Sequence, residues 1–307
     1  MREPVGPTGG AEVLPEETWQ ERERAHAARM REWTVPHQRR QQRGEPHPVW
    51  DFLFTYYSHR PSRLQRWQPG PGVVLSGVDA RRFLERTGYR EVPGGVTLDM
   101  AGFTHRRQHT ARFVLSLLEA TQSRTARLDC FGLHEWAMVY RETGDGIRHS
   151  HLPLRLGARG TDAAVESLDL RCTHYDAYRF FAEPAKPRNA TELSRDTQLD
   201  TEQPGCLHAN MDLFKWAYKL DPFVPAELLG DAFELAAHVR ELDMRASPYD
   251  LSGYGFTPVP IETPHGRAEY ARAQAGLARR AASIRSRLID HCRWLLAATQ
   301  HCSIRAK

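Results

Sequence analysis

A carboxylate and an imidazole stand next to each other in the segment FGLHEWAMVYRE, where aromatic and apolar residues surround them. Burial among such neighbours raises the pKa of a carboxylate, and a general acid or base needs a raised pKa. Glu135 is therefore a candidate catalytic carboxylate, with His134 beside it. The alternative is a buried Glu135 that forms an ion pair with an arginine. The two residues do not complete an HExxH zinc motif, because Met138 takes the place of the second histidine.

Histidines and an acid also alternate in the middle of the chain. The segments IRHSHLPLRLG and VESLDLRCTHYDAYRFF have a period of two, which predicts a pair of strands. Residues two apart on a strand face the same side, so pairing in register would bring three imidazoles and a carboxylate together. Such a set suits zinc or non-haem iron, and the alternative is a solvated strand face. The residues are His149, His151, His174 and Asp176.

Two acid and histidine pairs are spaced four residues apart in segments that have helical periodicity. Glu234 and His238 form one pair, and His208 and Asp212 form the other. Helical bundles build di-iron sites from pairs of this kind. The alternative applies most clearly to Glu234 and His238, which belong to a polar stripe opposite the apolar face of their helix. Such a stripe usually faces water.

The segment HPVWDFLFTYYSHRP, residues 47–61, contains five aromatic residues in eight positions. On a helix, Trp50, Phe54 and Tyr57 would share a face. Arginines follow at once, and aromatic rings interleaved with arginine suit a surface that stacks bases and holds phosphates. The alternative is a structural core in which the hydroxyl of Tyr56 forms a hydrogen bond.

The composition fits a folded protein. The chain has 307 residues, of which 40% are hydrophobic and 26% are charged, and its formal net charge is +4. No apolar run is long enough to cross a bilayer, and the N-terminus lacks the apolar core of a secretory signal. The five cysteines are scattered without a CxxC pair, which argues against a disulfide framework, a zinc ribbon and an iron–sulfur cluster. We therefore expect a cytoplasmic protein with no membrane partner.

Several common signatures are missing from the sequence, namely a P-loop, a GxGxxG turn, a GxSxG elbow and a standard DNA-reading module. Only four of the 42 Lys and Arg residues are lysine. A GC-rich genome would explain this preference, and so would a role for arginine in phosphate binding. Eight arginines lie in residues 29–66 and seven in residues 267–293, so two basic regions bracket a more neutral middle.

Helices account for most of the expected elements. Charge distribution and apolar periodicity predict helices at 14–33, 78–88, 103–122, 206–220, 225–246 and 267–300. Residues 72–77 predict a short strand, and the alternating segments at 147–157 and 165–181 predict the strand pair. The expected fold class is mostly helical α+β, a helical bundle with a small central antiparallel β element.

The longest helices have clear apolar faces. The predicted core of the helix at 225–246 is Leu228, Ala232, Leu235, Val239 and Leu242, and that of the last helix is Tyr270, Leu277, Ile284, Leu288 and Leu295. Residues 1–12 are expected to form a disordered tail, and residues 13–307 a single domain. The polar, proline-containing segment 183–205 is expected to be a lid loop.

Three segments resemble one family of proteins. HPVWDFLFTYYSHRPSRLQRWQPGPGVVL, CFGLHEWAMVYR and EQPGCLHANMDLFKWAYKL are similar to segments of actinobacterial proteins of this size that are commonly labelled 3-methyladenine DNA glycosylase-like. The similarity covers most of the chain. It implies a DNA-repair hydrolase that flips a damaged purine into an aromatic pocket, where a carboxylate stabilises the oxocarbenium ion or activates water. It implies no metal and no other cofactor.

For that mechanism we expect three groups of residues. The catalytic carboxylate would be Glu135 or Asp176, with His134 beside it. The side chains that would hold the base are Trp50, Asp51, Tyr56, Tyr57, Tyr140, Arg141 and Arg179. The side chains that would contact DNA are Arg60, Arg63, Arg66, Trp67, Arg106 and Arg107.

Three hypotheses about function therefore stand side by side. The first is an N-glycosylase that acts on DNA or on another nucleobase-containing substrate. The second is a metal-dependent enzyme of small-molecule metabolism, with iron or zinc on the histidines of the middle segments. The third is a nucleic-acid-binding protein without catalysis. Metal content separates the first two hypotheses, and salt-sensitive binding to duplex DNA would favour the first or the third.

Overall fold

The computed structural model describes residues 11–142 and 151–305. In this part of the chain helices predominate, and short strands form one sheet. The prediction of a mostly helical α+β fold is therefore confirmed. Within the same residues, no helix combines the length and the apolar character needed to span a membrane.

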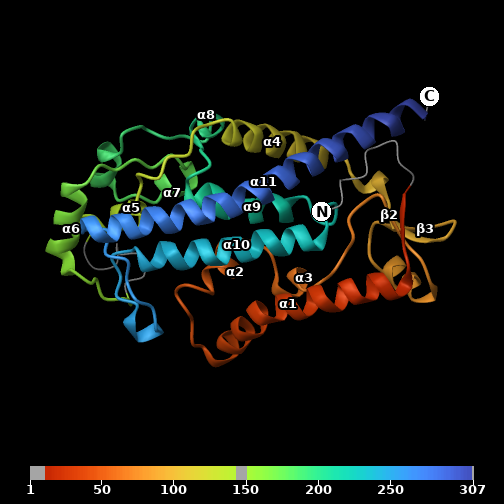
Figure 1. Ribbon diagram of the computed structural model, residues 1–307, viewed down its shortest axis with the longest axis horizontal. Coiled ribbons are helices and arrows are strands. Elements are labelled where there is room, and N and C mark those ends of the chain that lie inside the picture. Colours follow the sequence, from red (N-terminus) through yellow and green to blue (C-terminus); the bar gives the residue numbers. More distant parts are fainter. Residues whose placement is uncertain (1–10, 143–150, 306–307) are drawn as a thin grey trace.

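Three long helices form the centre of the molecule. Helices α9 (Leu207–Lys219) and α10 (Ala226–Arg245) are joined by residues 220–225 and pack against each other, and α11 (Pro264–Arg305) packs on both. Figure 1 shows α11 running along the length of the molecule beside α9 and α10. Helix α4 (His105–Gln122) covers another side of α11. These four helices enclose much of the core.

The apolar faces predicted from the sequence form this core. On α10 the buried side chains include Leu228, Ala232, Leu235, Val239 and Leu242. On α11 they include Tyr270, Ile284, Leu288 and Leu295, while Leu277 is partly buried against the same cluster. Each large apolar side chain that leaves water in this way stabilises the fold by roughly 1.5–3 kcal/mol.

Helix α1 (Glu16–Arg43) contacts the polar stripe of α10. Arg29 on α1 lies 2.8 Å from Asp231 and 2.5 Å from Glu234. The stripe therefore faces a second helix in part, and not only water, because oppositely charged side chains of the two helices pair there. Nδ1 of His238 donates a hydrogen bond to the backbone carbonyl of Glu234 within α10, and its ring packs against Trp33 of α1. Glu234 and His238 therefore both take part in the contact between the two helices.

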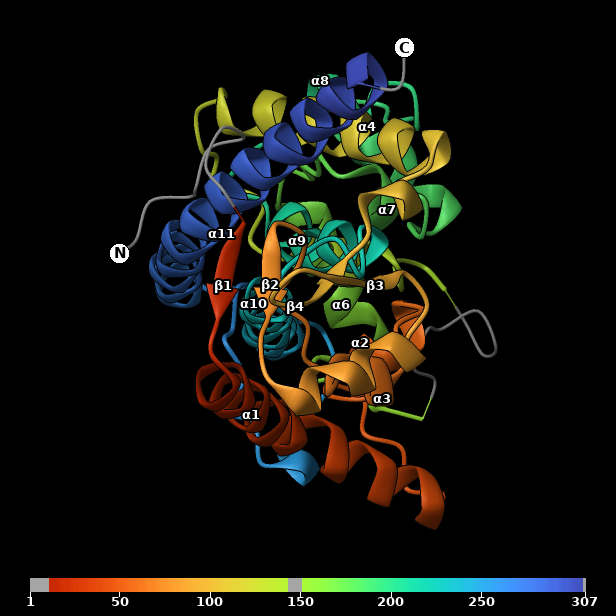
Figure 2. The ribbon, with the colours of Figure 1, turned by 90° about the vertical axis from the view of Figure 1, so that its right-hand side faces the viewer.

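The sheet lies at one end of the bundle and has the strand order β1-β2-β4-β3 (Figures 1 and 2). Strands β1 (Glu12–Leu14) and β2 (Val73–Leu75) are parallel. Strand β4 (Gly95–Leu98) is antiparallel to β2 and to β3 (Tyr89–Val92). The strand predicted at 72–77 is thus confirmed as β2, and the sheet is mixed.

A small separate core holds this sheet to α1 and to the 3₁₀ helix η1 (Val78–Glu85). Its centre is formed by Trp19, Trp67 and Phe83, which are fully buried. A Cβ on Gly95 would lie 1.9 Å from a backbone oxygen of β2, so glycine is required where β4 meets β2.

The strand pair predicted for the middle of the chain is wrong. Residues 143–150 lie outside the described residues, and the rest of the two segments contains helices α6 (Gly157–Ser167) and α7 (Tyr175–Tyr178) with loops around them. An isolated bridge joins Leu170 to Asn189. The alternating pattern misled because loop and helix residues there face the core and solvent in turn, and a short pattern does not fix an element type.

Short helices connect the larger elements. They are α2 (Phe52–Tyr56), α3 (Pro61–Leu64), η2 (Met100–Gly102), α5 (Leu133–Ala137), η4 (Glu183–Arg188), α8 (Gln198–Thr201) and η5 (Ser252–Tyr254). The segment 183–205, expected as a lid loop, contains η4 and α8, and it buries Glu202. Residues 1–10 of the expected tail lie outside the described part, and Glu12 begins β1.

Acid should destabilise the fold through His59. This side chain is 4% exposed, and burial lowers its pKa from 6.5 to about 4. Between these two pH values the unfolded chain binds a proton that the folded chain does not bind, so stability rises with pH across the window. Between neutral pH and pH ~4, we expect the unfolding free energy of His59→Phe to fall by roughly 2–3 kcal/mol less than that of wild type. Urea unfolding at several pH values measures this.

The control is His109→Phe, which replaces an exposed histidine on α4. It should leave the pH dependence of the unfolding free energy as in wild type. Parallel pH profiles for wild type and His59→Phe would show that His59 does not contribute to the acid sensitivity.

Candidate metal centre

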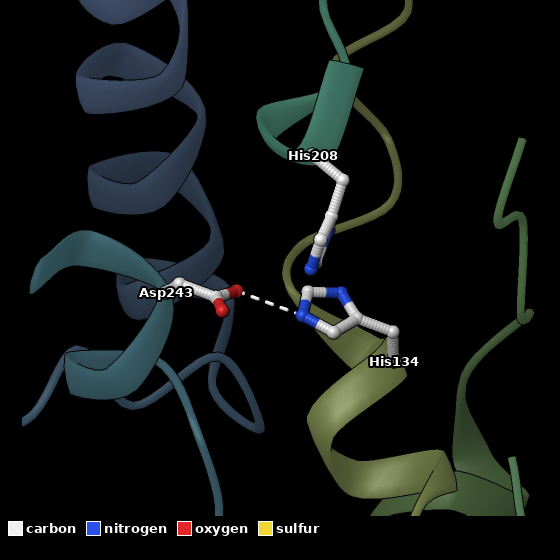
Figure 3. Close-up of side chains that lie close together, drawn as sticks. All are labelled: His134, His208 and Asp243. Carbon is white, nitrogen blue, oxygen red and sulfur yellow. Dashed lines mark ion pairs between the residues drawn. The ribbon is translucent and has the colours of Figure 1, made fainter. Parts of the chain in front are cut away.

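Three side chains with metal-binding atoms meet in the core (Figure 3). His134 comes from α5, His208 from the first turn of α9 and Asp243 from the last turn of α10. One ligand atom of each residue lies within 4.8 Å of the ligand atoms of the other two. We call these three residues the histidine–aspartate site.

Local structure explains how the three side chains come together. Because residues 220–225 reverse the chain, the start of α9 lies beside the end of α10, which sets His208 against Asp243. Helix α5 begins after Gly132, whose φ is 71° and where a Cβ would lie 3.3 Å from the ring of Tyr270. Glycine therefore lets α5 begin close enough to α11 to place His134 in the core.

The contact between His134 and Asp243 is close but unusual. Nε2 of His134 lies 2.8 Å from Oδ1 of Asp243, and both atoms are buried without a hydrogen bond of acceptable geometry. The rings of His134 and His208 meet edge to face with centroids 4.2 Å apart. The contact of His134 with Asp243 is an ion pair when His134 is protonated, and a cation bound between the two residues would take the place of that proton.

The protonation states of His208 and Asp243 suit a cation, whereas His134 would have to lose a proton to bind one. Burial lowers the pKa of His208 well below 6.5, and the nearby His134 lowers it further, so His208 is neutral and keeps a lone pair. Burial would raise the pKa of Asp243, but His134 outweighs it and lowers the pKa, so Asp243 is ionised. Burial would lower the pKa of His134, but Asp243 outweighs it and raises the pKa.

An arginine holds the other side of the site. Arg240 is 1% exposed and lies 2.7 Å from Glu135 and 3.1 Å from Oδ2 of Asp243. Its guanidinium carbon lies 3.9 Å from the centroid of the Phe52 ring. The structure therefore has the buried Glu135–arginine ion pair that the alternative interpretation of Glu135 predicted.

A second group of charged residues, buried or half-buried, adjoins the first. We call it the lysine cluster, and it consists of His174, Asp176, Glu202, Asp212 and Lys215. Nζ of Lys215 lies 2.9 Å from Asp176 and also contacts Asp212. Nε2 of His174 lies 3.2 Å from Asp212 and 3.4 Å from Glu202. Because Lys215 contacts two of the three carboxylates and His174 contacts the third, every carboxylate of the lysine cluster has a partner without a metal.

The inner cavity is a small space beside the histidine–aspartate site. Its volume is about 20 Å³, which is room for one water-sized molecule. It is lined by His134 and His208 together with Cys130, Leu133, Leu170, Arg171, Cys172, Thr173, Phe181, Cys206, Leu207 and Tyr270. The hydroxyl of Tyr270 is buried there and has no hydrogen-bond partner among the described residues. The cavity is thus mainly apolar and opens toward the two imidazoles.

The metal set predicted from the alternating segments does not form as expected. His149 lies outside the described residues, and His151 is exposed. His174 is 1% exposed and Asp176 is half-buried, and both belong to the lysine cluster. The prediction required two strands in register, and the described residues form α7 and loops there. His174 is nevertheless close to the histidine–aspartate site, since its ring centroid lies 5.5 Å from that of His208.

The aromatic segment 47–61 contributes to the core. Tyr57 is buried, and its hydroxyl donates to Oδ1 of Asp212 at 2.9 Å. Tyr56 is half-buried, and burial raises its pKa to about 12. Trp50 is half-buried and packs against Trp33 with ring centroids 5.6 Å apart. The alternative interpretation of this segment as core predicted a tyrosine hydroxyl that forms a hydrogen bond. Such a bond is present, but Tyr57 forms it and not Tyr56.

Asp51 connects the aromatic segment to α1. Its carboxylate contacts Arg40 and lies 2.8 Å from Nδ1 of His37. It also accepts a hydrogen bond from the backbone amide of His47 at 2.8 Å. The residue was expected to hold a base, and these three contacts already use its oxygen atoms.

Other residues expected to hold a base lie in two places. Tyr140 donates to Glu166 at 2.9 Å, and Arg141 donates to the same carboxylate at 2.7 Å. Arg179 lies 3.4 Å from Asp176, at the rim of the lysine cluster. Tyr140 and Arg141 are thus tied to α6 through Glu166.

Most of the arginines expected to contact DNA are exposed to solvent. Arg60, Arg63, Arg66 and Arg106 are exposed. Arg107 is half-buried and donates to the backbone carbonyl of Asp221 at 2.7 Å.

The expectation that the side chain of Trp67 contacts DNA is wrong. Trp67 is 0% exposed, and its indole donates to Glu227 at 2.8 Å. The sequence placed it among exposed arginines, but its ring completes the small core behind the sheet. No face of the ring is left for a base.

Asp243, Arg240 and Lys215 were missed as site residues in the sequence. Asp243 and Arg240 are three residues apart on α10 and lie off its polar stripe. Charged residues on the buried side of a strongly apolar helix are the signal that could have found them. His208 was noticed only for its spacing with Asp212, and the structure assigns these two residues to different clusters.

Comparison of the chain with protein-family models, with curated proteins and with solved structures finds no match.

Removal of the Lys215 charge should strongly destabilise the protein. Burial would lower the pKa of Lys215, but Asp212 and Asp176 outweigh it, so the ammonium stays charged. Lys215→Met would leave two carboxylates without their cation, and we expect a loss of about 3–5 kcal/mol of unfolding free energy. Urea titration of chelator-treated protein at neutral pH measures this.

Lys219→Met is the matched control, since Lys219 is exposed one turn further along α9. It should change stability by no more than ~0.5 kcal/mol. Equal effects of the two substitutions would contradict the role assigned to Lys215.

Proposed function

We propose that this protein is a metal-dependent enzyme that acts on a small molecule, with one non-haem iron or zinc ion held by His134, His208 and Asp243. The observation that carries the proposal is the convergence of one ligand atom from each within 4.8 Å in the core. Two imidazoles and one carboxylate form a common ligand set for catalytic zinc and for non-haem iron. The proposal keeps the class of the second sequence-based hypothesis and changes its ligands.

The neighbours of the three ligands support a cation. Arg240 lies against Oδ2 of Asp243 and leaves Oδ1 directed at His134. An arginine that orients a ligating carboxylate in this way fixes its geometry and its ionised state. A bound cation would replace the proton that Asp243 favours on His134, so metal binding would release a proton.

The inner cavity would give a metal held by His134, His208 and Asp243 room for a further ligand. Three protein ligands leave room for water or substrate on the metal. His134 and His208 line that cavity, whose volume of about 20 Å³ suits a metal-bound water or a diatomic molecule. Zinc would lower the pKa of such a water and supply a nucleophile, whereas iron would offer a position for dioxygen. The apolar walls would keep bulk water away from the reacting atoms.

The glycosylase suggested by the family resemblance stays a prediction. A base-flipping enzyme needs a pocket between aromatic rings and a free carboxylate. Tyr57 is bound to Asp212, Glu135 is bound to Arg240, and no residue of 47–61 lines the inner cavity. These contacts support a buried metal centre better than a nucleobase pocket.

Metal content tests the proposal directly. Purified wild-type protein, and chelator-treated protein reloaded with Fe(II) or Zn(II), should hold close to one metal ion per chain by elemental analysis. Asp243→Asn and His134→Gln should weaken metal binding by about 100-fold or more, because loss of a ligand exceeds the effect of losing a residue that orients one. Circular dichroism verifies that both variants fold.

His238→Gln is the control, since His238 lies on the same helix as Asp243 and faces α1 and Arg280. It should bind metal as wild type does. Failure of wild-type protein to bind either ion would refute the metal centre. Excision of alkylated bases from duplex DNA by chelator-treated protein, with loss of activity in Glu135→Gln, would instead establish the glycosylase.

A further inference from the structure

A larger cavity lies on the outer side of the inner cavity. We call it the outer cavity. Its volume is about 320 Å³, which is within the range of small-ligand sites. It is lined by Asp129, Phe131, Leu133, Ser167, Leu168, Asp169, Arg171 and Arg267.

The two cavities share walls. Leu133 and Arg171 line both of them, so these two side chains lie where the outer cavity adjoins the space beside the histidines. Leu133 is buried at the start of α5, directly before His134. The side chain of Arg171 is 42% exposed, which leaves it room to move.

Two aspartates hold Arg171 in place. Its guanidinium lies 2.9 Å from Asp129 and 3.0 Å from Asp169. Exposed ion pairs of this kind contribute only about 0–1 kcal/mol, so Arg171 can swing away from them at small cost. The arrangement fits a side chain that closes a passage and opens it reversibly.

Arg267 differs from Arg171 in its partners. It lies in the first turn of α11 and donates to the backbone carbonyl of Ile261 at 3.1 Å. Among residues 11–142 and 151–305, no carboxylate lies within ion-pair distance of its guanidinium. The wall beside it includes Phe131 and Leu168, which are apolar. A fixed cation next to an apolar wall suits a small organic acid.

We propose that the outer cavity binds a small carboxylic acid through Arg267 and that Arg171 closes the passage from this cavity to the inner cavity. The acid would place its carboxylate on Arg267 and its apolar part along Phe131 and Leu168. A reactive end of one or two heavy atoms would then enter the inner cavity when Arg171 moves. This inference rests on the proposed function in one respect only, namely the metal ion that the reactive end of the acid would contact.

Cysteine modification tests the passage without a need for metal or activity. Cys130 and Cys172 line the inner cavity and are half-buried, so they report access to it. The probe is methyl methanethiosulfonate, a small neutral reagent that forms a mixed disulfide and releases methanesulfinate. Peptide mass spectrometry of metal-free protein gives the rate at each thiol. Cys292 is buried in α11 outside both cavities and reports general unfolding.

We expect Arg171→Ala to speed modification of Cys130 and Cys172 by about five-fold with no change at Cys292, since one weak ion-pair barrier is removed. Arg127→Ala is the control, because Arg127 also contacts Asp129, at 3.7 Å, but lines neither cavity. It should leave all rates unchanged. Unchanged rates in Arg171→Ala would overturn the assignment of Arg171 as the closing residue.

Protection by small acids tests the ligand class. Acetate, hexanoate and benzoate are compared with acetamide, hexanamide and benzamide as protectors of Cys130 and Cys172. At least one acid should protect wild-type protein, and its amide should not. Arg267→Gln should weaken that protection about ten-fold, as expected for loss of one charge-assisted contact. Arg272→Gln replaces an exposed arginine on the same helix and should protect as wild type does.

The outcomes separate this inference from the proposed function. If no acid protects better than its amide, or if Arg267→Gln protects normally, the carboxylate site is refuted even when metal binds. If the acids protect as expected but no metal binds, the outer cavity stands and the metal-dependent enzyme does not.

Discussion

Charge buried inside an apolar helical bundle is the constraint that organises this protein. An isolated ion in such a core is strongly destabilising, so each charged group there needs a partner at contact distance. Arg240 contacts Glu135 and Asp243, and Lys215 contacts Asp176 and Asp212. In both cases one cation serves two carboxylates, and a histidine approaches one of those carboxylates from the other side.

The two clusters connect parts of the chain that are far apart in sequence. The histidine–aspartate site joins α5, α9 and α10, and the lysine cluster joins α7, α9 and the segment before α9. The aromatic segment 47–61 closes both of them. Phe52 lies over the guanidinium of Arg240, and Tyr57 donates to Asp212. The rings therefore exclude water from the ion pairs, which strengthens them.

The two clusters differ in whether they have room for a cation and a reactant. In the lysine cluster an ammonium group lies between the carboxylates, and the hydroxyl of Tyr57 uses a further acceptor. In the histidine–aspartate site Nε2 of His134 and Oδ1 of Asp243 lie 2.8 Å apart, and the neighbouring inner cavity is lined by His134 and His208. Only the second arrangement has both ligands for a cation and space for a reactant beside it. This contrast is the reason that the proposed chemistry is placed at His134, His208 and Asp243.

Paired charges are also found nearer the surface, at the outer cavity. Arg171, with its two aspartates, lies where the inner and outer cavities adjoin. Thiols and apolar side chains line the inner cavity beside the metal-binding residues, and exposed charges lie at its junction with the outer cavity. A reactant that is polar at one end and small at the other would match this order.

The sequence by itself determined the helical class, the apolar faces of α10 and α11 and the presence of β2, because these follow from local periodicity. It also contained the ion pair of Glu135 as one of two interpretations. The strand pair predicted for the middle of the chain was wrong, and the burial of Trp67 was not predicted. The meeting of His134, His208 and Asp243 was decided only by the tertiary structure. The reversal between α9 and α10 and the start of α5 at Gly132 bring these residues together, and no spacing along the chain encodes that distance.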